Sequence, residues 1–252
     1  MGKKGEKKHL KRKPAPKFWP IHRKEAVWTV KPKPGPHPLS RCIPLALVVR
    51  DVLKFAKTRK EAKTIISQGK IKVDGKVQRE EFFPTGLMDV ISILDSEKKY
   101  RVLPSEKGLV LHPIETEEAE FKLCRIENKT VVRGGHVQLN LHDGGSMLIR
   151  VDAPKKPEED VYQTLDTLKL SIPEQGFVAH MKLTVGAPAI IIGGKNVGKY
   201  GKITAIEEKP SRKRRDLLVT IEDKSGNLFQ TTLNFIFVLG ETESSISLPE
   251  VD

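Results

Sequence analysis

The sequence has few cysteines and no long apolar run, and each shortage excludes a class of protein. Cys42 and Cys124 are the only cysteines, with no CxxC pair and no paired histidine spacing, so neither a disulfide framework nor a zinc site is expected. No apolar segment approaches the roughly eighteen residues of a transmembrane helix. The lysine-rich start also lacks the apolar segment of a signal peptide. We therefore expect a soluble, intracellular protein whose two thiols lie in the core.

Acidic residues are scarce at the beginning of the chain, although they are common elsewhere. Residues 1–41 hold 13 Lys and Arg against 2 Glu, a net charge of +11. The other residues hold 32 basic and 30 acidic side chains, a net charge of only +2. This concentration predicts a polyanionic partner that the first forty residues enter, and nucleic acid is the leading candidate.

The first forty residues also lack an amphipathic period, because prolines interrupt them repeatedly between Pro14 and Pro38. We expect this arm to be extended or disordered alone and to order when phosphates neutralise its charges. Trp19 and Trp28 either stack on nucleobases or pack back onto the folded body. A nuclear-localisation signal or a membrane-binding patch is the alternative, which the interleaved tryptophans and prolines disfavour. The predicted RNA contacts here are Lys3, Lys4, Lys7, Lys8, Lys11, Arg12, Lys13 and Trp19.

The next stretch has the pattern of two short helices and a hairpin. Between residues 44 and 56, apolar residues recur at the spacing of one buried helix face. Thr58 and Glu61 form a capping box, which predicts a second helix that Gly69 closes. Apolar residues then alternate with lysines around Asp74-Gly75, the dipeptide that favours a tight hairpin turn.

The polar positions of this stretch are basic, and they are Arg59, Lys60, Lys63, Lys70, Lys72 and Lys76. The segments TRKEAKTIISQGKIKVDGKV and MDVISI resemble the S4-type RNA-binding domain of ribosomal proteins, pseudouridine synthases and some tRNA synthetases. The resemblance implies that the basic side contacts RNA phosphates. The alternative is a helical hairpin whose lysines are merely solvated.

The middle of the chain has short strand-like runs separated by Gly, Asn, Asp and Pro. From residue 99 to residue 151 these runs predict a small barrel or sandwich, followed by a Pro-rich, charged linker. Residues 84–181 carry 12 basic and 16 acidic residues, a net charge of −4. This part is therefore expected to act as a spacer or to face protein rather than RNA.

Near residue 190 a glycine-rich loop separates two strand-like runs. The segment resembles a KOW motif in an SH3-like barrel, and the resemblance implies that its glycines let the loop approach RNA closely. Residues 193–199 also satisfy GxxxxGK, the start of a phosphate-binding loop. The next residue is Tyr200, where that loop needs a Ser or Thr to bind magnesium, so nucleotide hydrolysis is rejected. The basic edge implied for this barrel is Lys195, Lys199, Lys202, Arg212, Lys213, Arg214 and Arg215.

No arrangement of catalytic residues is recognisable in the sequence. The histidines are scattered, HExxH is missing, and no segment matches the signatures of aminoacyl transfer or pseudouridine formation. HDGG at residues 142–145 fits a metal or base site, but a β-turn after a strand explains it better. We expect neither catalysis nor a cofactor nor a metal. An S4-type RNA-modifying enzyme and a KOW-type transcription factor are the alternatives.

Eight short matches occur in order along nearly the whole chain: KKHLKR, GPHPLSRCIPL, KIKVDGKV, FPTGLMDVISI, EEAEFKLCRI, GGKNVGKYGKIT, LNFIFVLG and ISLP. Together they resemble the small-subunit ribosomal protein four family of the archaeal and eukaryotic e-type. The resemblance implies a cytoplasmic, structural constituent of the small ribosomal subunit that binds ribosomal RNA and supports translation. It also implies a monomer beside neighbouring ribosomal proteins, with no membrane and no small-molecule substrate. His9 and Asn196 join the implied RNA contacts.

The expected fold class is α+β, mostly β. We expect five parts: a basic arm (1–40), an S4-type helix-hairpin domain (41–95), a central β-rich domain (96–172), an SH3-like KOW barrel (173–240) and a tail (241–252).

Overall fold

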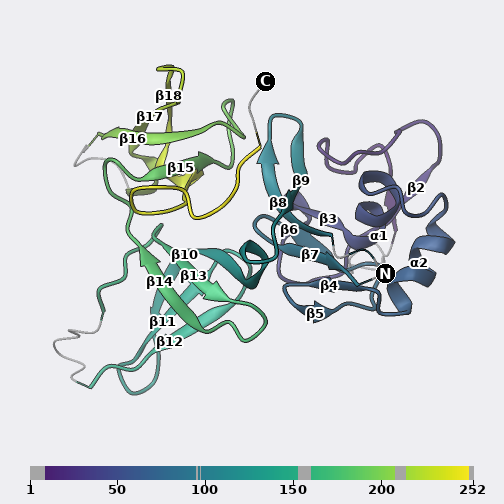
Figure 1. Ribbon diagram of the computed structural model, residues 1–252, viewed down its shortest axis with the longest axis horizontal. Helices are drawn as coiled ribbons and strands as arrows, with labels where there is room; N and C mark the ends of the chain where they lie inside the picture. The colour runs from purple at the N-terminus through teal and green to yellow at the C-terminus, as the bar shows by residue number, and fades with distance from the viewer. Residues whose placement is uncertain (1–8, 95, 97, 153–159, 208–213, 250–252) are drawn as a thin grey trace, which may run out of the picture.

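The computed structural model describes residues 9–94, 96, 98–152, 160–207 and 214–249. The predicted RNA contacts Lys3, Lys4, Lys7, Lys8, Arg212 and Lys213 lie outside these residues. Three five-stranded antiparallel sheets dominate the described chain, and its helices are few and short (Figure 1). The expected mostly β fold class is confirmed. None of these helices is long and apolar enough to cross a membrane.

The described part of the arm is folded, which corrects the expectation of a disordered segment. Ala15, Trp19 and Val30 are buried in one apolar cluster with residues of the next domain. The Trp19 indole N–H donates to the Cys42 carbonyl oxygen at 2.7 Å. A few separate apolar side chains hold the arm on the next domain, so the arm can fold without the hydrophobic periodicity of a helix or strand. Its elements are β1 (Leu10–Lys11), β2 (Trp28–Thr29) and the 3-10 helix η1 (Leu39–Arg41).

The helix-hairpin module follows the arm. The first helical stretch is shorter than predicted and contains a turn of π-helix, whereas the capping box of Thr58 and Glu61 is formed as predicted. In the hairpin turn, Asp74 and Gly75 both have positive φ, 49° and 73°. The elements are β3 (Cys42–Pro44), α1 (Leu45–Leu47), the π-helix η2 (Val48–Val52), α2 (Arg59–Ser67), β4 (Ile71–Val73), β5 (Lys76–Val77), β6 (Pro84–Gly86), β7 (Val90–Ile93), β8 (Lys99–Ser105) and β9 (Gly108–Ile114).

Strands of this module form two sheets. The larger has the order β5-β4-β7-β8-β9, and β3 pairs with β6 in the smaller. Strand β7 pairs with β8, which lies beyond residue 95. The boundary predicted at residue 95 therefore falls inside a sheet.

The central sheet has the order β12-β11-β10-β13-β14. Strand β10 is its longest, and residues on both of its faces are buried from Lys122 to Ile126. Strand β13 pairs with β14 across the predicted boundary at residue 172. The elements are the 3-10 helix η3 (Glu118–Glu120), β10 (Phe121–Val131), β11 (Val137–Leu141), β12 (Ser146–Ile149), β13 (Thr167–Ser171) and β14 (Phe177–Met181).

The C-terminal sheet has the order β18-β17-β16-β15-β19. Its core cluster also includes Leu123 of β10 and Leu103 of β8, so the three sheets share buried apolar surface. The elements are β15 (Pro188–Ile191), β16 (Tyr200–Ile206), the 3-10 helix η4 (Arg214–Asp216), β17 (Leu218–Glu222), β18 (Leu228–Thr232), the 3-10 helix η5 (Leu233–Phe235) and β19 (Ile236–Val238).

Candidate nucleic-acid interface

Helix α2 presents an apolar face to the core and a basic face to solvent. Ala62 and Ile66 are fully buried, whereas Lys60 and Lys63 are exposed. Two ammonium groups one helical turn apart can reach successive phosphates of an RNA backbone. This face therefore has the chemistry that the sequence predicts for it.

Arg59 begins the same helix but is already engaged within the protein. Its guanidinium Nε and Nη2 donate to the two carboxylate oxygens of Glu81, each at 3.1 Å. It also lies 5.4 Å from the centre of the Phe82 ring. Glu81 is buried, while half of the Arg59 side chain is exposed. Arg59 thus has a structural partner in addition to its predicted RNA contact.

The lysines of the hairpin differ in their surroundings. Lys76 is exposed, and Lys70 and Lys72 are half-buried. The hairpin tip contacts the central domain, because a Cβ at Gly75 would meet the Ile172 side chain at 2.7 Å. The tip is therefore held by protein, and its exposed lysine lies beside this contact.

The arm divides its predicted contacts between surface and interior. His9, Lys11 and Lys13 are exposed. Arg12 is buried, and its guanidinium donates to the Glu25 carboxylate at 3.1 Å and to the Trp28 carbonyl at 3.2 Å. Trp19 is 3% exposed, so it cannot stack on a base. The predictions for Arg12 and Trp19 do not fit these positions, because both side chains are used to fold the arm.

The glycine-rich loop after β15 is packed against protein. A Cβ at Gly193 would meet the Phe235 ring at 2.6 Å, and one at Gly198 would meet the Ser105 backbone at 2.8 Å. These glycines therefore permit close contacts inside the molecule. Such contacts explain their presence without an approach to RNA.

The predicted RNA contacts of the C-terminal sheet and its loops are partly engaged within the protein. Lys195, Lys202 and Arg214 are exposed. Lys199 lies over the Phe229 ring at 4.0 Å, and the Asn196 amide donates to the Gln230 carbonyl at 3.3 Å. Arg215 donates to the Asn128 side chain of the central sheet at 3.1 Å.

The predicted RNA contacts that the structure describes lie on elements at two ends of the molecule. Helix α2 and strand β2 lie at one end of the long axis, and β16, β17 and β18 lie at the other (Figure 1). An RNA that contacts both ends would have to extend along the molecule.

A buried charge cluster at the junction of the arm, module and central sheet was not predicted. The Lys122 ammonium on β10 is within 2.8 Å of Asp74, 2.6 Å of Asp89 and 3.1 Å of Asp143. An ammonium has three N–H donors, so each can meet one carboxylate. The His37 Nε2 atom lies 3.0 Å from Asp89, which ties the arm to the same cluster.

The cluster shifts the pKa values of its members in opposite directions. Burial and the charge of Asp89 raise the pKa of Asp74 to about 6. Burial alone would lower the pKa of Lys122, but the carboxylates of Asp89 and Asp74 outweigh it and raise the pKa well above its usual range. Burial disfavours ionised Asp89 and Asp143, yet the Lys122 charge holds the pKa of both carboxyls below the ordinary value.

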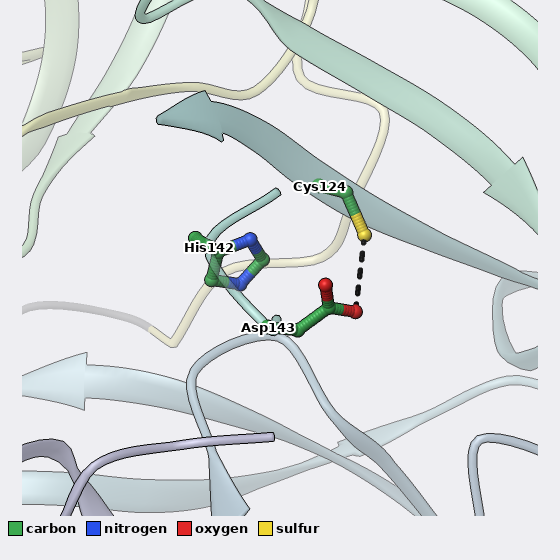
Figure 2. A group of neighbouring side chains, drawn as sticks. All are labelled: Cys124, His142 and Asp143. Atoms are coloured by element: carbon green, nitrogen blue, oxygen red, sulfur yellow. Dashed lines mark hydrogen bonds between the residues drawn. The ribbon is translucent and has the colours of Figure 1, made fainter. Parts of the chain in front are cut away.

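Cys124, His142 and Asp143 lie together, with their ligand atoms within 4.8 Å of one another (Figure 2). His142 Nδ1 accepts from the Arg125 backbone N–H at 3.2 Å, and Nε2 lies 3.1 Å from the Leu87 carbonyl. Both ring nitrogens therefore have protein partners, and burial lowers the pKa of His142 to about 4. The Lys122 ammonium beside Asp143 would also repel a cation. This arrangement suits a hydrogen-bonded turn better than a metal site.

HDGG forms that turn, as the sequence predicted. Gly144 has a φ of 76°, and the Leu141 N–H donates to the Gly145 carbonyl. Both cysteines are buried free thiols, also as predicted.

A signal for the buried cluster was present in the sequence. In the strand-like run EFKLCRI, Lys122 alternates with Cys124 and Ile126 and so shares their apolar face. A lysine at such a position requires buried acidic partners. Asp89 and Asp74 lie 33 and 48 residues earlier in the chain, Asp143 follows later, and no local pattern identifies these partners.

Comparisons with known proteins agree with this architecture. The model described as "Ribosomal family S4e" matches residues 96–177, the RS4NT (NUC023) domain matches residues 4–40, and the S4 domain matches residues 44–91. The small ribosomal subunit protein eS4 of Staphylothermus marinus is 55% identical over 99% of this chain and 99% of its own length. The chain belongs to the S4e family of ribosomal proteins. The predicted family resemblance is confirmed.

Other members of the S4e family are similarly close. The eS4 proteins of Aeropyrum pernix and Methanocaldococcus jannaschii are 52% and 50% identical, covering 99% and 98% of this chain and 98% and 100% of their own lengths. The crystal structure of the 30S ribosomal protein S4e from Thermoplasma acidophilum has a TM-score of 0.66 at 30% identity. The match covers 80% of this chain and 96% of the Thermoplasma acidophilum chain.

Proposed function

We propose that this chain is a structural constituent of the small ribosomal subunit, where it binds ribosomal RNA and supports translation without catalysing a reaction. The similarity to eS4 proteins along nearly the whole chain carries this proposal. The exposed Lys60 and Lys63 on α2 of the S4 domain supply its physical basis. An RNA-modifying enzyme is not favoured, because the family is ribosomal and His142 is fully hydrogen-bonded.

Finer parts of the proposal concern location and partners. The protein would lie in the cytoplasm as a single copy within each ribosome, beside other small-subunit proteins. The central domain would face protein, because residues 84–181, which include it, carry a net charge of −4.

We also propose that the C-terminal sheet is an SH3-like KOW barrel. Its five antiparallel strands in the order β18-β17-β16-β15-β19 and the glycine-rich loop between β15 and β16 support this assignment. Among the described residues, the proposed RNA contacts include the exposed cations Lys11, Lys13, Lys60, Lys63, Lys76, Lys195, Lys202 and Arg214.

The test is binding of the full chain to small-subunit ribosomal RNA at increasing salt. If roughly seven phosphates are contacted at ~0.7 ion each, the logarithm of affinity falls with a slope of about −5 against the logarithm of salt concentration. A slope near −1 would contradict the proposal. Tagged protein should also co-sediment with small subunits and leave them only in molar salt, and recovery as a free protein in low salt would contradict it.

A further inference from the structure

The two tryptophans of the arm occupy opposite environments. Trp19 is 3% exposed and hydrogen-bonded, whereas Trp28 is 55% exposed. Trp19 therefore accounts for the packing of the arm onto the folded body. The large apolar ring of Trp28 remains on the surface without a comparable structural role.

The position of Trp28 follows from the pairing of two short strands. Leu10 faces Thr29 across the pair, and Lys11 faces Trp28. Because neighbouring residues of a strand point to opposite faces, Leu10 and Thr29 turn inward when Lys11 and Trp28 turn outward. Burial agrees, since Leu10 and Thr29 are half-buried while Lys11 and Trp28 are exposed.

Arg12 holds this pair of strands through hydrogen bonds. Its backbone N–H donates to the Val27 carbonyl at 3.0 Å, and its guanidinium Nε donates to the Trp28 carbonyl at 3.2 Å. The guanidinium also bonds the His22 carbonyl and the Glu25 carboxylate. The backbone that carries the exposed indole is thus held before any partner arrives, which lowers the ordering cost of binding.

Groups suited to a nucleotide surround the indole. The His9 ring centre lies 5.5 Å from that of Trp28 at an interplanar angle of 52°. The Lys11 ammonium lies 5.8 Å from the same ring, and Lys13 is exposed nearby in sequence. Exposed aromatic rings beside cations bind single-stranded nucleic acid by stacking on bases while the cations contact phosphates. The net charge of +11 in residues 1–41 favours RNA over a protein partner.

We propose that Trp28, His9 and Lys11 form a stacking platform for one unpaired RNA base, with Lys11 reaching the adjoining phosphate. This site rests on the proposed role in RNA binding and names the chemistry of one contact within it. Stacking on an indole accepts any base, so the platform would select an unstacked nucleotide rather than a sequence.

The experiment uses the full chain, an oligoadenylate probe and small-subunit ribosomal RNA. Acrylamide should quench the fluorescence of Trp28 in the free protein, because this ring is exposed. Trp19 should contribute little to the quenching, because it is buried. Oligoadenylate should remove this quenching. Trp28→Ala should weaken oligoadenylate binding by about 5- to 150-fold, whereas Trp28→Phe, which keeps an aromatic face, should retain most of the affinity.

Lys182→Ala is the matched control, because Lys182 is exposed and lies outside the predicted RNA contacts. It should leave oligoadenylate affinity unchanged. Thermal melts of each variant check folding, and the acrylamide assay on the unmodified chain decides the question even if Trp28→Ala does not fold.

The outcomes separate this inference from the proposed function. If the unmodified chain fails to bind ribosomal RNA, the proposed function is wrong. If it binds that RNA while Trp28 stays open to acrylamide, the platform is wrong and RNA binding stands. Protection of Trp28 only in assembled subunits, with none from RNA alone, would show that a neighbouring protein covers it and would also overturn the platform.

Discussion

Lys60 and Lys63 on α2 and Lys122 on β10 carry the same ammonium group in opposite surroundings. The two helix lysines are exposed, while Lys122 is 4% exposed and meets three carboxylates. The helix lysines can contact RNA phosphates, whereas Lys122 on β10 is already paired with carboxylates inside the fold. Net charge alone therefore overstates how many cations an RNA partner can use.

Among the substitutions of these lysines, Lys122→Ala should destabilise the fold most. The substitution leaves Asp74, Asp89 and Asp143 together without their shared cation, and removing one partner of a buried ion pair costs about 3–5 kcal/mol of folding free energy. Denaturant unfolding measures the loss, and Lys63→Ala is the control, expected to change stability by less than about 0.5 kcal/mol. Equal midpoints for the two variants would show that the cluster does not stabilise the fold.

A pH series tests the same cluster through Asp74. The pKa of this carboxyl is raised from 3.8 to about 6, so the folded state holds its proton more tightly than the unfolded chain does. Its stabilising contribution is therefore complete below pH 4 and is lost as the pH rises through about 6. The stability of the unmodified chain relative to Asp74→Asn should fall by on the order of 3 kcal/mol across this window. Parallel pH profiles in urea unfolding would refute the shift.

Arg59→Ala tests a cation that is partly exposed, like Lys60 and Lys63, but paired with a buried carboxylate, like Lys122. The substitution leaves the buried Glu81 carboxylate without its guanidinium partner. Because half of the Arg59 side chain is exposed, solvent screening limits the expected loss of folding free energy to about 1–2 kcal/mol. Thermal unfolding next to Lys60→Ala measures it. A loss confined to RNA affinity, with unchanged melting, would assign Arg59 to RNA alone.

The smallest effect on stability is expected for the double variant Lys60→Ala and Lys63→Ala. Both side chains are exposed, so the free energy of unfolding should change by less than about 0.5 kcal/mol. The salt dependence of RNA binding should fall by roughly 0.7–0.9 in slope for each lysine that contacts a phosphate. Replacement of Lys182 and Lys224, two exposed lysines outside the predicted set, is the control. An unchanged slope would remove α2 from the interface.

Local chemistry made helix α2 and the hairpin predictable. The capping box of Thr58 and Glu61 lies within four residues, and the turn at Asp74-Gly75 needs only two positive φ angles. Similarly, the HDGG turn was identified because its glycines and aspartate act on their own backbone.

Contacts between distant segments were not predictable from such patterns. The Trp19 indole donates to the carbonyl of Cys42, 23 residues later. Because the arm is held by contacts of this kind, its sequence shows no hydrophobic periodicity. Gly198 was attributed to an approach by RNA, but Ser105 from another sheet occupies that space. Asp74 was predicted as a turn residue, and its ion pair with Lys122 depends on a strand 48 residues away.

The buried cluster also constrains the order in which the chain can finish folding during synthesis. His37, Asp74 and Asp89 emerge from the ribosome before Lys122, and domains generally fold from the N-terminus as they are made. A nascent chain that ends before β10 holds the two aspartates without the ammonium that neutralises them. The N-terminal module therefore reaches its final charge balance only after β10 has been translated, and Asp143 completes the cluster about twenty residues later.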